Sequence, residues 1–467
     1  MLPIIKKCIS IVMSLAALLF LTQCDQMKGF KIPGLSSLTG AVQRTPISTS
    51  LEDAVTEIPS LDGFKPLQTV SLASQPRDTA SGGFRLERSG FYSMVAQSYC
   101  LHAGTYAPGG GDGYIYAPLK GSRAEIVRNI LQRSVNYPAI DQHEIQILIW
   151  AIISKTKISS MDVSMISNAS KLLTPTELAM LNDVYIEEAA GKLAQSSLPP
   201  EVFRIMEAES QVRGLLSTGQ AAYANIERVA VLAGAAPWGL GSRKTPEGRW
   251  SYHPDGYFVR YFPSNYSRTA IDAYVPECLR IERDNQGRVI LIEDQQGNRI
   301  QIQYTGTDTP VPGDGNIKAC AFGSVKISTR TGRGFSQDGR GWTLVGWPSG
   351  NGKPETSPFA DLPQRYQWAE NFVTTHKFLA TGSGSAGNPI DLAHLDYALK
   401  ALGASQVTDL ATRAFLYEIC LRQGKCRPGC GSAGGQVVVF DPTWSVATPG
   451  NTSRQRLATS ARVYRGN

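Results

Sequence analysis

Cys100 and Gln146 are the two residues of this chain whose types could combine in a covalent reaction. Gln146 is the only polar residue in the run 145–153, which is too short to span a bilayer, because a span takes about 20 residues. A buried amide without a partner costs roughly 1–3 kcal/mol. If the Cys100 thiolate attacked the Gln146 carboxamide, ammonia would leave and an internal thioester would remain. In the alternative, the amide bonds to nearby backbone and Cys100 forms a disulfide.

Such a reaction needs a thiol and a carboxamide held together without water, and a donor for the oxyanion. The pattern of residues 91–101 predicts a strand that carries Cys100. A helix is predicted to begin near Asp141, and on it Gln146 and Trp150 lie four residues apart, so they share one face. His102 and His143 are the candidates for assisting proton transfer.

Other elements connect these two segments. Residues 103–113 are rich in glycine and predict a mobile flap over Cys100, since they lack the Gly-Lys-Ser/Thr of a phosphate loop. Residues 114–116 predict a short strand. Ser122 with Glu125 three residues later is typical of a capping box, which predicts the start of a helix that ends by Asn136.

The region of roughly residues 91–155 resembles the bacterial thioester domains. Tyr99-Cys100-Leu101 is similar to their aromatic-Cys-apolar motif, and residues 145–150 are similar to their motif Thr-Gln-x-Ala-x-Trp, with Ile145 and Leu148 in place of Thr and Ala. The helix predicted before Pro138 is also similar, although the stretch from Cys to Gln is short. In that family the two residues form an internal thioester that captures amines. The resemblance implies that Cys100 is the thiol, that Gln146 is the acyl donor, and that the partner carries an amine such as a protein lysine.

Two other functions are open. One is a Cys–His amide hydrolase or transamidase, with Cys100 as the nucleophile, a histidine as the base and an aspartate that orients it. The residues available for those roles are His253, His376, His394, Asp255 and Asp391. The other is an envelope scaffold lipoprotein without chemistry.

The N-terminus has the pattern of a targeting segment. Lys6 and Lys7 precede the apolar run 9–21, and Leu21-Thr22-Gln23-Cys24 resembles a bacterial lipoprotein signal, although Gln23 stands where a small residue is expected. We therefore expect lipidation at Cys24 and a membrane-anchored protein of the bacterial envelope, facing the periplasm or on the cell surface. An uncleaved anchor or plain secretion are the alternatives.

Six cysteines follow Cys24, in a compartment where disulfides persist. Cys278 and Cys320 flank a strand-rich block and could pair. The even total argues that Cys100 belongs to a disulfide. The spacing of the last three matches no common zinc framework, so we expect neither a metal nor a cofactor. The disulfide candidates other than Cys100 are Cys278, Cys320, Cys420, Cys426 and Cys430.

The composition indicates a globular protein of several domains: 467 residues, of which 42% are hydrophobic and 18% charged. We expect a multidomain α+β fold. The predicted order is a signal peptide (1–23), a flexible stalk (24–84), a thioester-like module (85–160), a helical block (161–245), an antiparallel β-meander (246–345), and a helical hairpin with a Cys-rich segment and a tail (346–467).

The charge of the chain is weakly basic. Its formal charge of +7 becomes +5 once the signal, with Lys6 and Lys7, is removed. The densest basic stretch carries Arg454, Arg456, Arg462 and Arg465 without interleaved aromatic residues, so it predicts a solvated tail. We expect no nucleic-acid partner.

Overall fold

The computed structural model describes most of the body of the chain. The described residues are 69–182, 200–219, 222–239, 241–311, 314–328, 334–337, 341–346 and 438–465, with short pieces at 46–47, 51, 54, 57–58, 389–390 and between 410 and 421. This part is a mixed α+β structure, which confirms the predicted fold class. The predicted signal peptide, with Cys24, lies outside the described residues.

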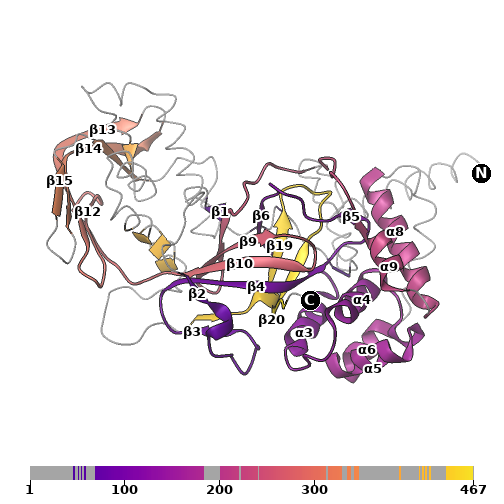
Figure 1. Cartoon of the computed structure of the whole chain (residues 1–467). Helices are drawn as coiled ribbons and strands as arrows, with labels where there is room; N and C mark the ends of the chain where they lie inside the picture. The colour runs from indigo at the N-terminus through magenta and orange to yellow at the C-terminus, as the bar shows by residue number, and fades with distance from the viewer. Residues whose placement is uncertain are drawn as a thin grey trace, which may run out of the picture.

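A closed barrel of six antiparallel strands forms the centre of the molecule (Figure 1). Its longest strand is β4 (Gly90–Cys100), which confirms the strand predicted before Cys100. The ring closes where Tyr114 pairs with Tyr261. The strands in order around the barrel are β4, β20 (Leu457–Val463), β19 (Ser445–Pro449), β6 (Tyr114–Pro118), β9 (Tyr257–Pro263) and β10 (Arg268–Val275).

Buried residues alternate with partly exposed residues along most of β4, as expected for a strand with one face inside the barrel. Tyr92, Met94 and Ala96 are buried, and they pack with the interior-facing residues of the other strands. Residues 114–118 form a strand as predicted.

Further short strands extend this sheet and show where the body begins. β8 (Trp250–His253) pairs with β9, β1 (Glu57–Ile58) pairs with β8, and β2 (Val70–Ser71) pairs with β4. Leu72 and Phe84 have no solvent exposure. The predicted stalk is therefore wrong for residues 69–84, because they pack against the barrel. The remaining short strands are β3 (Phe84–Leu86) with β18 (Val438–Phe440), and β5 (Thr105–Tyr106) with β7 (Val231–Leu232).

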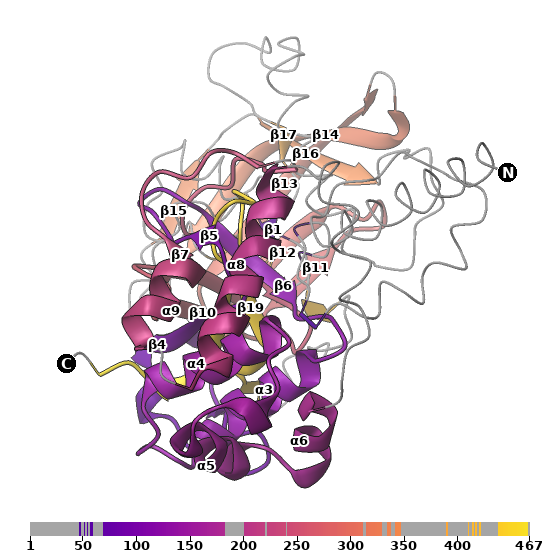
Figure 2. The same cartoon turned by 90° about the vertical axis from the view of Figure 1, so that its right-hand side faces the viewer.

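The helices between residues 124 and 230 gather at one end of the barrel, and the second sheet lies at the other (Figures 1 and 2). One hydrophobic core joins these helices to the Cys100 end of β4. The predicted boundary at residue 160 is therefore wrong, because the thioester-like module and the helical block bury their apolar faces together. The helices are α3 (Ala124–Ser134), α4 (Gln142–Ile153), α5 (Val163–Leu172), α6 (Pro175–Asn182), α8 (Pro200–Ser217) and α9 (Tyr223–Ala230).

Helix starts follow local chemistry in α4 but not in α3. The Asp141 carboxylate accepts from His143 N at 2.7 Å, and Glu144 accepts from Asp141 N at 3.0 Å, which completes a capping box. Helix α3 begins at Ala124, two residues after the predicted start at Ser122, and its N-cap residue Arg123 makes no side-chain cap. The Arg123 backbone N–H donates to Pro46 O at 2.8 Å, so a distant segment also holds this start.

The second sheet contains the predicted meander. Its turns are built by Asp284 and Asp294, whose carboxylates each accept backbone N–H groups two and four residues later. Residues 250–275, however, belong to the sheet that forms the barrel and not to the meander. The strands are β11 (Arg280–Arg283), β12 (Val289–Glu293), β13 (Arg299–Val311), β14 (Asp314–Ser328), β15 (Gly334–Gln337), β16 (Gly341–Gly346) and β17 (Pro389–Ile390).

The predicted solvated tail is wrong. Residues 445–463 supply two barrel strands, and Arg456 is only 4% exposed. Arg454 pairs with Asp112 at 2.7 Å, and Arg462 donates to Ile140 O at 2.9 Å. These basic residues fasten the C-terminal strands to earlier segments.

Most of the predicted helical hairpin at 362–421 lies outside the described residues. The described residues of its second arm are helical, and Leu410, Ala414, Leu416 and Tyr417 are buried against the second sheet. Within the described part of the chain, no helix combines the length and the apolarity needed to cross a bilayer.

Candidate functional site

The Gln146 carboxamide lies directly against the backbone of Cys100. The Cys100 N–H donates to Gln146 Oε1 at 2.8 Å, and Gln146 Nε2 donates to Cys100 O at 3.2 Å. Cys100 is 0% exposed and Gln146 is 1% exposed. The last residue of β4 and the middle of α4 thus form one dry contact.

These two bonds satisfy the buried amide with neighbouring backbone. Cys100 is present as a buried thiol, so the predicted alternative of a Cys100 disulfide is not what the structure contains. The same contact also meets two needs of the predicted reaction. It holds the carboxamide still, and it already places an N–H donor on the oxygen where negative charge would develop.

The thiol itself is protonated at rest. Burial raises the pKa of Cys100 well above its usual value, and the charge of Glu227 raises it further. A reaction at this sulfur therefore requires that its proton be removed within the pocket.

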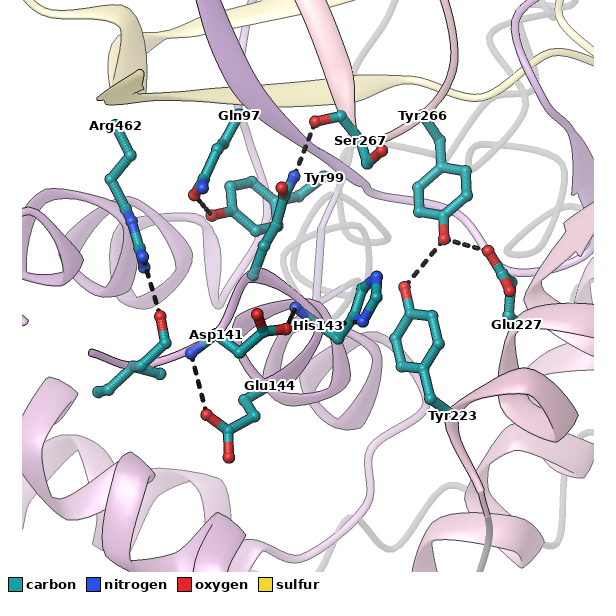
Figure 3. Close-up of polar contacts among 12 residues, drawn as sticks. Gln97, Tyr99, Asp141, His143, Glu144, Tyr223, Glu227, Tyr266, Ser267 and Arg462 are labelled. Atoms are coloured by element: carbon teal, nitrogen blue, oxygen red, sulfur yellow. Dashed lines mark hydrogen bonds and ion pairs between the residues drawn. The ribbon is translucent and has the colours of Figure 1, made fainter. Parts of the chain in front are cut away.

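Three side chains form a hydrogen-bonded chain beside the pair (Figure 3). Tyr223 Oη lies 2.9 Å from Tyr266 Oη, and Tyr266 Oη donates to Glu227 Oε1. Burial is the largest cause that raises the pKa of both tyrosines, and the Cys100 thiol contributes to each shift. The chain thus lies within electrostatic range of the sulfur.

Tyr223 covers the face of α4 that carries Gln146. His143, Gln146 and Trp150 follow a spacing of three and then four residues, so they line one side of the helix. The Tyr223 ring stacks on His143 at 4.1 Å and packs on Trp150 at 5.5 Å between centroids. Tyr223 therefore packs across the side of α4 that carries Gln146.

Of the candidate histidines, His143 stacks on Tyr223 beside the site. His102 is buried, and burial lowers its pKa to about 3, so its ring is neutral at physiological pH. His253 lies between the rings of Tyr116 and Tyr257, with Nδ1 3.4 Å from the Asp255 carboxylate. Among the described residues, no histidine hydrogen-bonds to the Cys100 thiol; His376, His394 and Asp391 fall outside them.

The glycine-rich loop predicted as a flap is held in place by its one carboxylate, while Gly110 and Gly111 at its tip are exposed. Asp112 accepts from Gly109 N at 3.1 Å and forms an ion pair with Arg454. A Cβ on Gly113 would meet the backbone of Thr245 and Pro246 at 2.2–2.3 Å, so the loop end packs tightly there. A role over Cys100 stays a prediction.

The other cysteines are only partly described. Cys320 is a buried thiol, which contradicts the predicted pairing of Cys278 with Cys320. Cys278 Sγ lies 3.5 Å from Tyr417 Oη, and the buried Cys420 has its Sγ 3.9 Å from Gly256 O. Cys426 and Cys430 lie outside the described residues.

Sequence reasoning missed the chain formed by Tyr223, Tyr266 and Glu227. The spacing of Tyr223 and Glu227, four residues apart, was the available signal that they share a helix face. Tyr266 lies in the turn between β9 and β10, where nothing in the sequence marks it. The described residues contain no group of His, Cys, Asp and Glu arranged to hold a metal ion.

No match to this chain was found among protein-family models, curated proteins or solved structures. The likeness to thioester domains therefore depends on the two sequence motifs and on the contact between Cys100 and Gln146.

Proposed function

We propose that the chain forms an internal thioester between Cys100 and Gln146 and uses it once, to capture an amine on a partner. The observation that carries this proposal is the pair of hydrogen bonds that hold the Gln146 carboxamide on Cys100 in a buried contact. Because the fold already holds the Gln146 carboxamide against Cys100, the entropy cost of bringing the two groups together is met during folding.

The bond changes are simple. The Cys100 thiol gives up its proton, the sulfur attacks Gln146 Cδ, and the C–N bond breaks. The nitrogen leaves with that proton as ammonia. During the attack, charge develops on Gln146 Oε1, where the Cys100 N–H stabilises it. Exclusion of water then protects the thioester from hydrolysis.

The proposed setting is the bacterial envelope. Lipid attached at Cys24 would tether the protein to a membrane, and the body would present the thioester to an amine-bearing partner such as a protein lysine. The protein would then act as an adhesin that bonds covalently, without turnover.

Intact mass spectrometry of residues 25–467 tests the proposal. We expect a mass one ammonia below that of the sequence, and we expect Cys100→Ala to restore the full mass of its own sequence. Cys320→Ala is the matched control, because it removes a second buried thiol and should keep the deficit. A full mass together with an alkylatable Cys100 in the unfolded protein would end the proposal.

An envelope scaffold without chemistry is the second candidate, and one observation favours it. The two backbone bonds already explain why Gln146 is tolerated in the core, without any reaction. The same mass measurement separates the two functions, since a scaffold retains its ammonia.

A further inference from the structure

We infer that Glu227, acting through Tyr266 and Tyr223, is the base that accepts a proton from an entering alkylammonium group, so that the site selects cationic primary amines. This inference rests on the proposed thioester. It concerns the capture of an amine, whereas the mass deficit reports the formation of the thioester. An experiment can therefore contradict the inference and leave the proposed function in place.

The hydrogen bonds among Tyr223, Tyr266 and Glu227 fix which group donates to which. Tyr266 Oη donates its proton to Glu227, so the bond of 2.9 Å between the two phenols must be donated by Tyr223. The lone pairs of Tyr223 Oη are then left to accept from another N–H group. Within the chain, Tyr223 is the member whose ring packs on α4, against His143 and Trp150 on either side of Gln146, so we place the accepting hydroxyl at the reacting pair.

The surroundings suit a cation. The His143 and Tyr223 rings stack beside the α4 face that carries Gln146, and an alkylammonium is attracted to the face of an aromatic ring. The Glu227 carboxylate lies behind these rings (Figure 3) and attracts the same charge. A neutral hydroxyl nucleophile gains neither interaction.

The capture step balances as follows. The ammonium passes one proton to Tyr223, which passes its own to Tyr266, which passes its own to Glu227. The amine lone pair then attacks the carbonyl carbon of the thioester, and the C–S bond breaks. The proton that remains in excess on nitrogen moves to the Cys100 sulfur, which ends as a thiol. An amide links partner and Gln146, and Glu227 later loses its proton to water.

Glu227 is not expected to help the earlier formation of the thioester. Its negative charge disfavours the Cys100 thiolate, as the raised pKa of that thiol reflects. Glu227→Gln should therefore keep the mass deficit while it loses the base.

Two small nucleophiles test the assignment. Methylamine is protonated at neutral pH and must lose a proton before it attacks, whereas hydroxylamine is neutral and needs no base. We would measure the rate at which each forms an adduct, by intact mass, in the wild type, in Glu227→Gln and in Tyr266→Phe. The phenylalanine keeps the ring but breaks the hydrogen-bonded chain. Glu207→Gln, which changes an exposed carboxylate on α8, is the matched control.

We expect both variants to show the mass deficit and to react with hydroxylamine at the wild-type rate. We expect both to react with methylamine at least about tenfold more slowly, because a positioned base contributes on the order of 10²–10⁴-fold. Equal slowing of both nucleophiles, or an unchanged methylamine rate, would overturn the inference and leave the thioester standing. Loss of the deficit in both variants would assign the chain to thioester formation instead and would also overturn it. A wild type without a deficit would remove the proposed function itself.

Discussion

At the scale of single residues, Gln146 supports the fold as well as the proposed chemistry. Gln146→Leu leaves the Cys100 N–H and C=O buried without partners, so we expect the free energy of unfolding to fall by about 1–3 kcal/mol. Denaturant unfolding measures this. Gln211→Leu, which changes an exposed amide on α8, should alter stability by less than about 0.5 kcal/mol. Equal stability of wild type and Gln146→Leu would show that these bonds contribute nothing.

The reacting pair could be predicted from the sequence, but the side chains around it could not. Gln146 stands out because it is the one polar residue in an apolar run, and a buried amide demands a partner. Tyr223, Glu227 and Tyr266 come from a helix and a turn far along the chain. Only tertiary packing brings their hydroxyl and carboxyl groups together, and tyrosines are common enough that none of them signals a role.

At the scale of elements, the start of α6 illustrates how a local signal is coupled to packing. Thr174 and Glu177 form reciprocal hydrogen bonds at the helix start, and Glu177 also accepts from Asn129 and Arg133 of α3. Burial alone would raise the pKa of Glu177, but the hydrogen bonds from Arg133, Thr174 and Asn129 outweigh it and hold the pKa at about 2.

This lowered pKa predicts a loss of stability in acid. A carboxylate whose pKa is depressed by folding stabilises the protein above its unfolded pKa of about 4.3, and that stabilisation disappears as the pH falls toward 2. We expect the melting temperature of Glu177→Gln to depend less on pH in this window than that of the wild type. Glu125→Gln, at an exposed carboxylate, should follow the wild type. Parallel curves for wild type and Glu177→Gln would contradict the coupling.

The elements that sequence patterns identified were those with a strong local signal. Helix α4 begins at an acidic cap, as predicted near Asp141, and the meander turns begin at aspartates. Strands β19 and β20 were missed, because serine, threonine and alanine alternate there in place of large apolar residues. Their buried hydroxyls find partners only in the assembled barrel, as Thr459 does with Pro442 O at 2.8 Å.

At the scale of the whole molecule, the barrel depends on its last strands. β20 lies between β4 and β19, and Leu457 pairs with Cys100 itself. Removal of residues 438–467 opens the barrel and uncovers the edge of β4, so we expect loss of the cooperative unfolding transition, measured by circular dichroism on heating. Removal of residues 466–467 alone should leave the transition in place. Cooperative unfolding of the longer truncation would show that the helices and the remaining strands are sufficient.

The prediction of separate domains that follow one another along the chain was wrong for the same reason. The helical block shares a core with β4, and the barrel takes strands from residues 90–118, 257–275 and 445–463. The composition of a segment reflects only that segment, whereas a barrel closed by strands far apart in the sequence leaves no pattern in any one of them. Only the meander could be recognised as a unit, since its strands follow one another along the chain.

The pairing of Leu457 with Cys100 also sets an order of events in the cell. During synthesis or export, the strand that carries the thiol emerges long before the strand that shields its edge. In the proposed function, the thioester would therefore form only after residues 457–463 have emerged, so a shorter nascent chain would not bond to bystander amines during export.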